Sequence, residues 1–297
     1  MKTEIEKLLA DYLGYLEIEK NRSPKTSENY GRYLKAFIAQ TGVKSAGGIT
    51  ADVVRDFRVA LAKTGVKKIT QSYYVIALRT FLTYLIKRGI KTLPPETIEL
   101  PKIARRDIEV LDYRELERLL DAPKGNDLRA LRDRALLETL FSTGLRLSEL
   151  CGLNRYLDLE RGEISVRGKG DKLRVVFLST GSKEKLKAYL DKRPDAEEAL
   201  FVSISRGGKI VGRITPRSVE RLVDFYARKA GIPKKVHPHQ LRHSFATDLL
   251  INGADIRSVQ ELLGHANIAT TQVYTHLTNK ELREVHEAFH SRRRKKE

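Results

Sequence analysis

Apolar residues recur at helical spacing through the first part of the chain. Between Ile5 and Leu16 they stand three or four positions apart, which places them on one face of a helix. Ser23-Pro24 has the form of an N-cap followed by a first-turn proline. Two later runs of apolar residues have the same helical spacing. One starts near Thr50 and stops around Gly65, and the other starts near Thr70 and stops at Gly89. The pattern predicts a small bundle of four helices.

The helical period stops between Lys91 and Ile108. This stretch contains Leu93-Pro94-Pro95 and Leu100-Pro101-Lys102 among charged residues, a composition typical of a linker stiffened by proline. We therefore predict a helical domain over residues 1–92, a linker over 93–107 and a second domain over 108–297.

Helical and extended patterns alternate in the second domain. Short apolar runs separated by turn residues predict a three-stranded antiparallel meander over 156–159, 163–166 and 173–178. A further short hairpin is predicted around 200–211, with Gly207-Gly208 at its turn. Helices are predicted over 112–120, 128–141 and 182–190, after Thr215-Pro216, from Pro238, and over 279–289. The expected fold is mainly α with a small antiparallel sheet, an α+β class.

Composition restricts the partner more than it restricts the fold. The chain has 297 residues, of which 41% are hydrophobic, enough for the cores of two ordinary domains. It carries 56 Lys+Arg against 38 Asp+Glu, a net charge of +18. So large an excess of one sign favours a polyanionic partner, and nucleic acid is the leading candidate.

Cysteine content and the amino terminus bear on the compartment. Cys151 is the single cysteine, so neither an internal disulfide nor a cysteine-based zinc site is expected. The chain opens on Met1-Lys2-Thr3-Glu4-Ile5 without an apolar leader, and no apolar run approaches the roughly 20 residues that span a bilayer. The expected location is the cytoplasm, with no membrane partner.

The stretch from His239 to Tyr274 concentrates groups that can act on a phosphodiester. If Pro238 opens a helix, His239 and Arg242 project from one face, so an imidazole and a guanidinium can reach one anion. The Tyr274 hydroxyl is a nucleophile only when its proton is removed and the phosphate charge is neutralised. Taken alone, Tyr274 is more often a half-buried core residue, and His239 with His243 are more often two surface histidines than a zinc site.

Two earlier positions add candidate chemistry. Arg146 follows the helix-ending Thr143-Gly144 and starts the next helix, where the helix dipole does not favour a cation. Glu149 could pair with Arg146 or orient a neighbour, and an ordinary surface ion pair is the plainer alternative. Lys169 lies between two glycines in the turn 168–172. Two interpretations remain open: a basic turn that is merely solvated, or a turn that brings the Lys169 ammonium group to the leaving oxygen of a reaction.

The first domain also carries many basic residues on its polar faces. They are interleaved with tyrosines such as Tyr73, and a solvated surface is as good an explanation as a clamp on DNA phosphates. These basic residues are Lys25, Arg32, Lys35, Lys67, Lys68, Arg79, Lys87 and Arg88. A basic tail closes the chain over 291–297.

Five motifs in order make the chain resemble the tyrosine site-specific recombinases, and within them the Xer type of chromosome-dimer resolvase. The motifs are Thr143–Leu150 (TGLRLSEL), Gly168-Lys169-Gly170, His239–Thr247 (HQLRHSFAT), Leu263-Gly264-His265 and Thr271–His276 (TQVYTH). The resemblance covers nearly the whole length. One departure is Tyr156, where family members often have an aspartate; it lies at a strand entry and touches no candidate catalytic group.

The resemblance implies an N-terminal four-helix core-binding (SAM-like) domain, a mixed catalytic domain and a mechanism. Arg146 and Arg242 would bind the scissile phosphate, and Tyr274 would attack phosphorus to give a 3′-phosphotyrosyl bond. Lys169 would protonate the 5′-oxygen, His239 would assist proton transfer at Tyr274, and His265 would hydrogen-bond the phosphate. Neither metal, cofactor nor ATP would be needed. Exchange on two duplexes implies four protomers around a Holliday junction, with the helix over 279–289 docking on a neighbour.

Other functions remain open from the sequence. They are integration or resolution of a mobile element, relaxation of DNA in the manner of a type IB topoisomerase, and non-catalytic DNA binding on a recombinase scaffold. A zinc enzyme using His239 and His243 is poorly supported, because no third ligand stands at helical spacing beside them.

Overall fold

The structure, a computed structural model, describes residues 2–101, 110–168 and 173–264. The chain divides into two compact units, Met1–Arg106 and Asp107–Glu297. In the described ranges no helix is both long enough and apolar enough to cross a bilayer.

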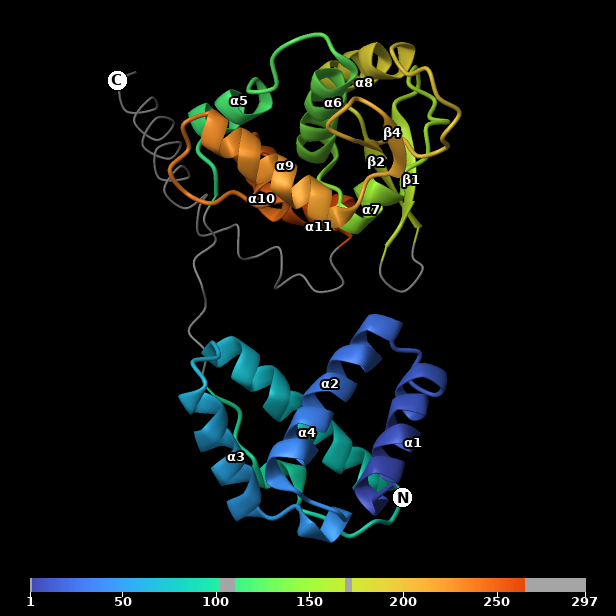
Figure 1. Cartoon of the computed structure of the whole chain (residues 1–297). Helices are drawn as coiled ribbons and strands as arrows, with labels where there is room; N and C mark the ends of the chain where they lie inside the picture. The colour runs from blue at the N-terminus through green and yellow to red at the C-terminus, as the bar shows by residue number, and fades with distance from the viewer. Residues whose placement is uncertain (1, 102–109, 169–172, 265–297) are drawn as a thin grey trace, which may run out of the picture. The chain divides into compact units, whose positions relative to one another are not determined.

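The described residues of the first unit form the four predicted helices (Figure 1). They are α1 (Glu4–Ile18), α2 (Pro24–Thr41), α3 (Ala51–Lys63) and α4 (Lys68–Lys87). The side chains of Thr3, Ser23 and Thr50 each accept a hydrogen bond from a first-turn backbone N–H, which satisfies a donor that the helix leaves unpaired. The cap residues in the sequence therefore set three of the four starts.

An aromatic cluster fills the centre of the first unit. Tyr12 is 1% exposed, its ring centroid lies 5.2 Å from that of Phe81, and its hydroxyl lies 2.9 Å from Thr80 Oγ1, to which it donates. Burial of a ring of this size contributes about 2 kcal/mol of hydrophobic stabilisation. The hydrogen bond removes the cost of burying the phenol oxygen.

Part of the segment after α4 packs on the first unit. A 3₁₀ turn, η2 (Pro95–Thr97), leads to Ile98, which is 3% exposed and whose carbonyl accepts a hydrogen bond from Arg79 Nη1 at 2.8 Å. Residues 93–98 therefore extend the helical unit beyond residue 92, because Ile98 is buried and its carbonyl binds Arg79 of α4.

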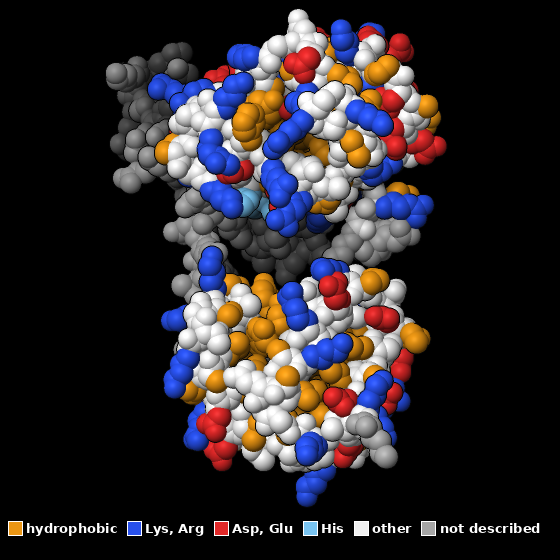
Figure 2. All heavy atoms as spheres, viewed as in Figure 1, with side chains coloured by type: hydrophobic (Ala, Val, Ile, Leu, Met, Phe, Trp, Pro, Cys, Tyr) orange, Lys and Arg blue, Asp and Glu red, His pale blue; other side chains and the backbone are white. Residues whose placement is uncertain are grey.

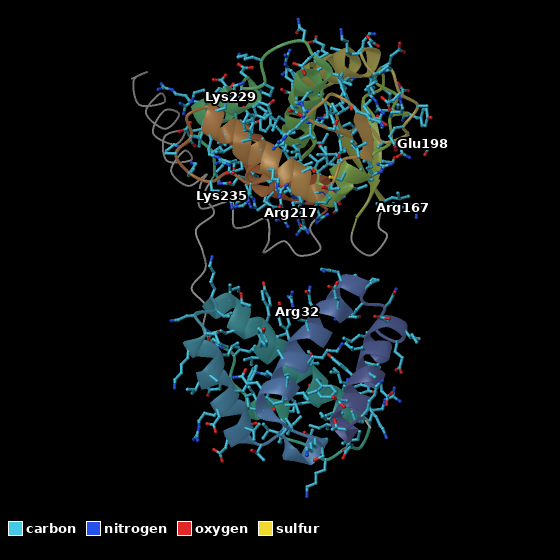
Figure 3. The ribbon with its side chains drawn as sticks, viewed as in Figure 1. Arg32, Arg167, Glu198, Arg217, Lys229 and Lys235 are labelled. Atoms are coloured by element: carbon cyan, nitrogen blue, oxygen red, sulfur yellow. The ribbon has the colours of Figure 1, made fainter. Side chains whose placement is uncertain are left out.

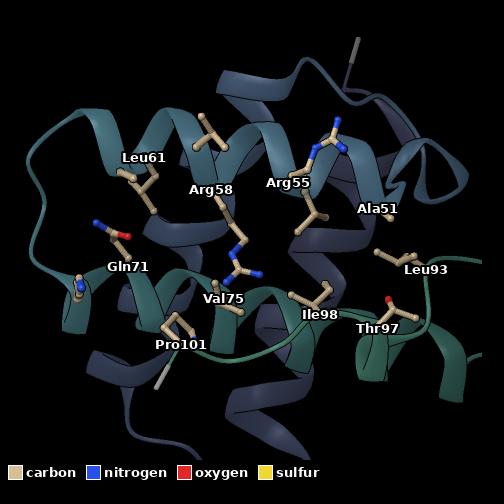
Figure 4. A pocket seen from close by; sticks show the side chains of 14 residues that line it. Ala51, Arg55, Arg58, Leu61, Gln71, Val75, Leu93, Thr97, Ile98 and Pro101 are labelled. Atoms are coloured by element: carbon tan, nitrogen blue, oxygen red, sulfur yellow. The ribbon is translucent and has the colours of Figure 1, made fainter. Parts of the chain in front are cut away.

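This segment, α3 and α4 enclose a groove of about 580 Å³ (Figure 4). Its floor is apolar, and the Arg58 side chain extends from α3 across it. The lining includes Val54, Leu61, Val75, Leu93, Ile98, Arg55 and Arg58.

The second unit is built around helix α6 (Leu128–Thr143), whose Leu136, Leu137 and Leu140 are fully buried. Figure 1 shows α6 among the other elements of this unit. These elements are α5 (Tyr113–Leu120), α7 (Leu147–Gly152), α8 (Thr180–Asp191), α9 (Pro216–Lys229), α10 (Pro238–Ile251), α11 (Ile256–Leu263), β1 (Glu163–Arg167), β2 (Leu173–Phe177), β3 (Val202–Ile204) and β4 (Ile210–Arg213). The mainly helical fold with small antiparallel sheets is confirmed.

The predicted three-stranded meander is wrong in its first strand. In the described residues β1 pairs with β2 alone, with Ser165 opposite Val175, and β3 pairs with β4. Asp158 instead closes a turn: its carbonyl accepts from Gly162 N–H at 2.9 Å and its side chain from Arg161 N–H at 2.9 Å. An aspartate that binds nearby backbone N–H groups favours a turn over a ladder.

Candidate active site

A sharp turn between α6 and α7 places Arg146. Gly144 ends α6 with φ 57° and ψ 26°, a left-handed conformation that glycine adopts without strain. A Cβ at this position would lie 2.3 Å from Phe245 Cδ1 of α10, far inside van der Waals contact. Glycine is thus required both by the backbone and by the close approach of α10.

Arg146 lies directly before α7 and is partly exposed, with 30% of its side chain accessible. Its Nη1 donates to Glu149 Oε1 at 3.0 Å, and its Nη2 donates to the Gly264 carbonyl at 2.7 Å. The side chain is therefore held at both ends of its guanidinium while its edge still reaches the surface.

Arg242 on α10 is 5% exposed. Its Nη1 donates to the Gly144 carbonyl, and its Nη2 donates to the Leu263 carbonyl at 2.6 Å. This one guanidinium joins the carboxyl ends of α6 and α11, which lie far apart in the sequence.

The carboxyl end of α11 gathers three guanidiniums. The Leu262 carbonyl accepts from Arg174 Nε at 3.0 Å, and the next two carbonyls accept from Arg242 and Arg146. The last carbonyls of a helix lack intrahelical partners and carry partial negative charge, so they attract cations. Arg146 and Arg242, the two predicted phosphate ligands, are thereby brought to consecutive carbonyls.

Glu149 is the acidic counterpart of this cluster, with only 6% of its side chain exposed. Its Oε2 accepts from Arg146 N–H at 2.7 Å, and both oxygens accept from the Arg174 guanidinium at 2.8 and 2.6 Å. Desolvation raises the pKa of this carboxyl, but the hydrogen bonds from Arg174 and Arg146 outweigh it and lower the pKa to about 2. The pairing of Glu149 with Arg146 is present in the structure.

Replacing Glu149 with glutamine should destabilise the protein in a pH-dependent way. The carboxyl pKa falls from 4.5 when unfolded to about 2 when folded, so its contribution is present above pH 4.5 and is lost as pH falls toward 2. At pH 7 we expect E149Q to unfold more easily by on the order of 3 kcal/mol. Urea unfolding of both proteins at pH 7, 4 and 3 should show the difference between their unfolding free energies becoming smaller as the pH falls.

The control for this variant is Glu163→Gln on β1. Glu163 pairs with Arg161 at 2.8 Å, but this pair is exposed, so its loss should change the unfolding free energy by under about 0.5 kcal/mol. A penalty for E149Q that stays constant from pH 7 to pH 3 would contradict the assignment.

His239 stands one helical turn before Arg242 on α10. The side chain is exposed, yet partial desolvation and then the charge of Arg242 lower its pKa below 6.5. The half-buried His243 has its pKa lowered to about 4, first by desolvation and then by His239 and Arg242. At pH 7 both imidazoles are neutral, so His239 can accept a proton.

Three predicted site residues, Lys169, His265 and Tyr274, lie outside the described residues. The predicted helix over 279–289 and the basic tail lie there too. Of the six predicted residues, the structure therefore places Arg146, His239 and Arg242. Among the described residues, no group of three or more His, Cys, Asp or Glu side chains is arranged to hold a metal ion.

Arg174 on β2 was not predicted from the sequence. Side chains alternate across a strand, and Arg174 falls on the same face as the buried Val176, while Leu173 and Val175 are exposed. An arginine at an inward position of an alternating strand was the available signal, because such a charge requires a partner.

Basic side chains gather on one face of the second unit. Figure 2 shows Lys and Arg gathered about a histidine on the second unit. Figure 3 shows Arg217, near the start of α9, and Lys235, just before α10, along one edge of that unit. Both side chains are exposed, as a surface that binds phosphates requires.

Comparison with known proteins identifies the family. A model described as the phage integrase family matches residues 109–281, and one described as the phage integrase N-terminal SAM-like domain matches residues 9–89. The chain belongs to the phage integrase family. Tyrosine recombinase XerC of Salmonella typhi is 42% identical over 289 residues, which cover 95% of this chain and 94% of the relative.

Solved structures of site-specific recombinases agree with this assignment. The XerA recombinase is 32% identical with a TM-score of 0.54, over 96% of this chain and 98% of that one. The XerH site-specific recombinase bound to a palindromic difH substrate is 26% identical with a TM-score of 0.72, over 93% and 82%. The chain is a Xer-type tyrosine recombinase, a DNA strand-exchange enzyme, and the sequence-based expectations of family, fold and activity are confirmed.

Proposed function

We propose that this recombinase cleaves and rejoins both strands of a specific double-stranded DNA site in the cytoplasm and thereby resolves chromosome dimers. The XerC relatives match over nearly the whole chain, and a chain of net charge +18 suits a DNA partner. Action on a mobile element would use the same chemistry at a different site.

The observation that carries the proposal is the placement of two guanidiniums at one helix end. Arg146 and Arg242 donate to the consecutive carbonyls of Gly264 and Leu263. Two cations at neighbouring oxygens suit the two non-bridging oxygens of one phosphate. They would neutralise the charge that develops on those oxygens when a nucleophile attacks.

Tyr274 would be that nucleophile. Its oxygen forms a bond to phosphorus, the bond from phosphorus to the 5′-oxygen breaks, and the 3′ end stays on the enzyme as a phosphotyrosine. The neutral His239 would accept the phenol proton, Lys169 would give a proton to the departing 5′-oxygen, and His265 would hydrogen-bond the phosphate. A 5′-hydroxyl of a partner duplex then reverses the step without water or ATP.

Exchange of two strand pairs requires four active centres. Four protomers would therefore surround the paired duplexes and a Holliday junction, each contributing one tyrosine. The segment over 279–289 would dock on a neighbouring protomer and set which tyrosines act. The first unit would bind backbone phosphates through exposed basic side chains such as that of Arg32 on α2.

Recovery of the covalent adduct from genomic DNA tests the proposal. The enzyme is incubated with DNA and digested, and both the attached peptide and the attached ends are sequenced. We expect a peptide that contains Tyr274 and ends that share one recurrent sequence. Ends scattered over unrelated sequences, with relaxation of plasmids lacking the site, would instead indicate topoisomerase activity, and absence of any adduct would leave a non-catalytic DNA-binding protein.

A further inference from the structure

Arg174 joins three elements of the second unit that meet at the candidate site. It projects from β2, binds Glu149 on α7, and binds the Leu262 carbonyl at the end of α11. Only 10% of its side chain is exposed. Three of its nitrogens donate to named acceptors, so its orientation is fixed from two sides.

The contact with Glu149 has the geometry that only arginine provides. Nη1 lies 2.8 Å from Oε1 and Nη2 lies 2.6 Å from Oε2, two parallel bonds between a guanidinium and a carboxylate. A lysine would keep the charge but could not form this fork or the bond from Nε. Gly264 packs so closely that a Cβ there would lie 3.0 Å from Arg174 Cδ.

Arg146 depends on the same two partners. Its backbone N–H and its Nη1 donate to the Glu149 oxygens, and its Nη2 donates to the Gly264 carbonyl. Arg174 thus orients both groups that orient Arg146: the carboxylate directly, and the helix end through the Leu262 carbonyl two residues earlier. If Arg174 were lost, both supports of the Arg146 guanidinium could shift.

We infer that Arg174 is a positioning residue for strand cleavage, which acts by fixing Glu149 and the end of α11 so that the Arg146 guanidinium meets the scissile phosphate. The inference rests on the proposed function, because it takes Arg146 as a phosphate ligand. Arg174 itself faces inward and acts through Arg146. A displacement of about 1 Å at a reacting group can cost about 100-fold in rate.

The test compares two substrates that differ in phosphate charge. One is a nicked duplex with the natural scissile phosphate; the other carries a methylphosphonate there, in which an uncharged methyl group replaces one non-bridging oxygen. Single-turnover adduct formation is measured for wild type, Arg174→Gln and Arg174→Lys. On the natural substrate we expect about a 100-fold loss for Arg174→Gln and a smaller loss for Arg174→Lys.

On the methylphosphonate the loss should shrink to roughly 10-fold or less, because less charge remains for a misplaced Arg146 to neutralise. Arg146→Lys is the positive reference, and its loss of rate should likewise be larger on the natural substrate than on the methylphosphonate. Arg161→Gln removes an exposed arginine–glutamate pair at the start of the same hairpin and should leave both rates unchanged.

Equal losses on the two substrates, or no loss on either, would overturn the inference, since reduced folding lowers both rates alike. If a thermal melt shows that Arg174→Gln is not folded, the two substrates are compared with Arg174→Lys alone. Failure of the proposed function is distinguishable, because wild type itself would then form no adduct on the natural substrate.

Discussion

Replacing Tyr274 with phenylalanine is expected to abolish covalent protein–DNA adducts. The change removes one oxygen, the atom that would attack phosphorus, and no other hydroxyl is expected to reach the same position in line with the leaving group. DNA affinity should stay within about threefold of wild type, because binding comes mainly from cations on phosphates. Adducts on a nicked substrate, resolved by denaturing electrophoresis, measure the first effect and a filter-binding titration the second.

The matched control is Tyr156→Phe. Tyr156 is 76% exposed and follows α7 without belonging to a strand, so loss of its hydroxyl should leave adduct formation unchanged. Adducts formed by Tyr274→Phe at more than a trace of the wild-type level would show that another residue is the nucleophile.

Replacing Arg242 with glutamine should reduce both cleavage and stability. Removing one preorganised donor to a developing oxyanion costs about 10²–10³-fold in rate. The buried Gly144 and Leu263 carbonyls would also lose the donor that joins α6 to α11, which should lower the free energy of unfolding by on the order of 3 kcal/mol. Single-turnover cleavage and urea unfolding measure the two effects separately.

Arg228→Gln on α9 serves as the comparison for Arg242. The Arg228 side chain is 73% exposed and pairs with Asp224, so its loss should change stability by under about 0.5 kcal/mol and leave cleavage intact. An Arg242→Gln protein that cleaves within tenfold of wild type would remove Arg242 from the phosphate site.

Local signals made most of the fold predictable. The caps at Thr3, Ser23 and Thr50 and the left-handed Gly144 act within one turn of their own position, so the sequence alone reports them. The same holds for Arg146, because the conflict between a cation and a helix start is visible in the sequence.

Contacts between distant residues were not predictable in the same way. The donation of Arg242 to the carbonyls of Gly144 and Leu263 depends on how α10 packs against α6 and α11. Such main-chain acceptors exist at every residue and leave no mark in the sequence. Ile98 was assigned to the linker for a similar reason: one apolar residue among charges has no period, and its burial depends on α4.

The error at residues 156–159 has a different origin. Tyr156-Leu157-Asp158-Leu159 alternates as a strand does, and in isolation the pattern is ambiguous. The turn that Asp158 forms with Arg161 and Gly162 satisfies the backbone locally, and no partner strand is then needed.

The arginines at the end of α11 contact oxygens of the main chain, which every amino acid possesses. Substitution at Leu262, whose side chain is half-buried, can therefore vary the side chain without removing the acceptor that Arg174 uses. Gly264 is constrained in its side chain instead, since its φ of 62° strains any other residue and an added Cβ would lie 3.0 Å from Arg174 Cδ and displace that side chain. Saturation mutagenesis should accordingly find that position 262 tolerates most residues, whereas position 264, two residues later, strongly favours glycine.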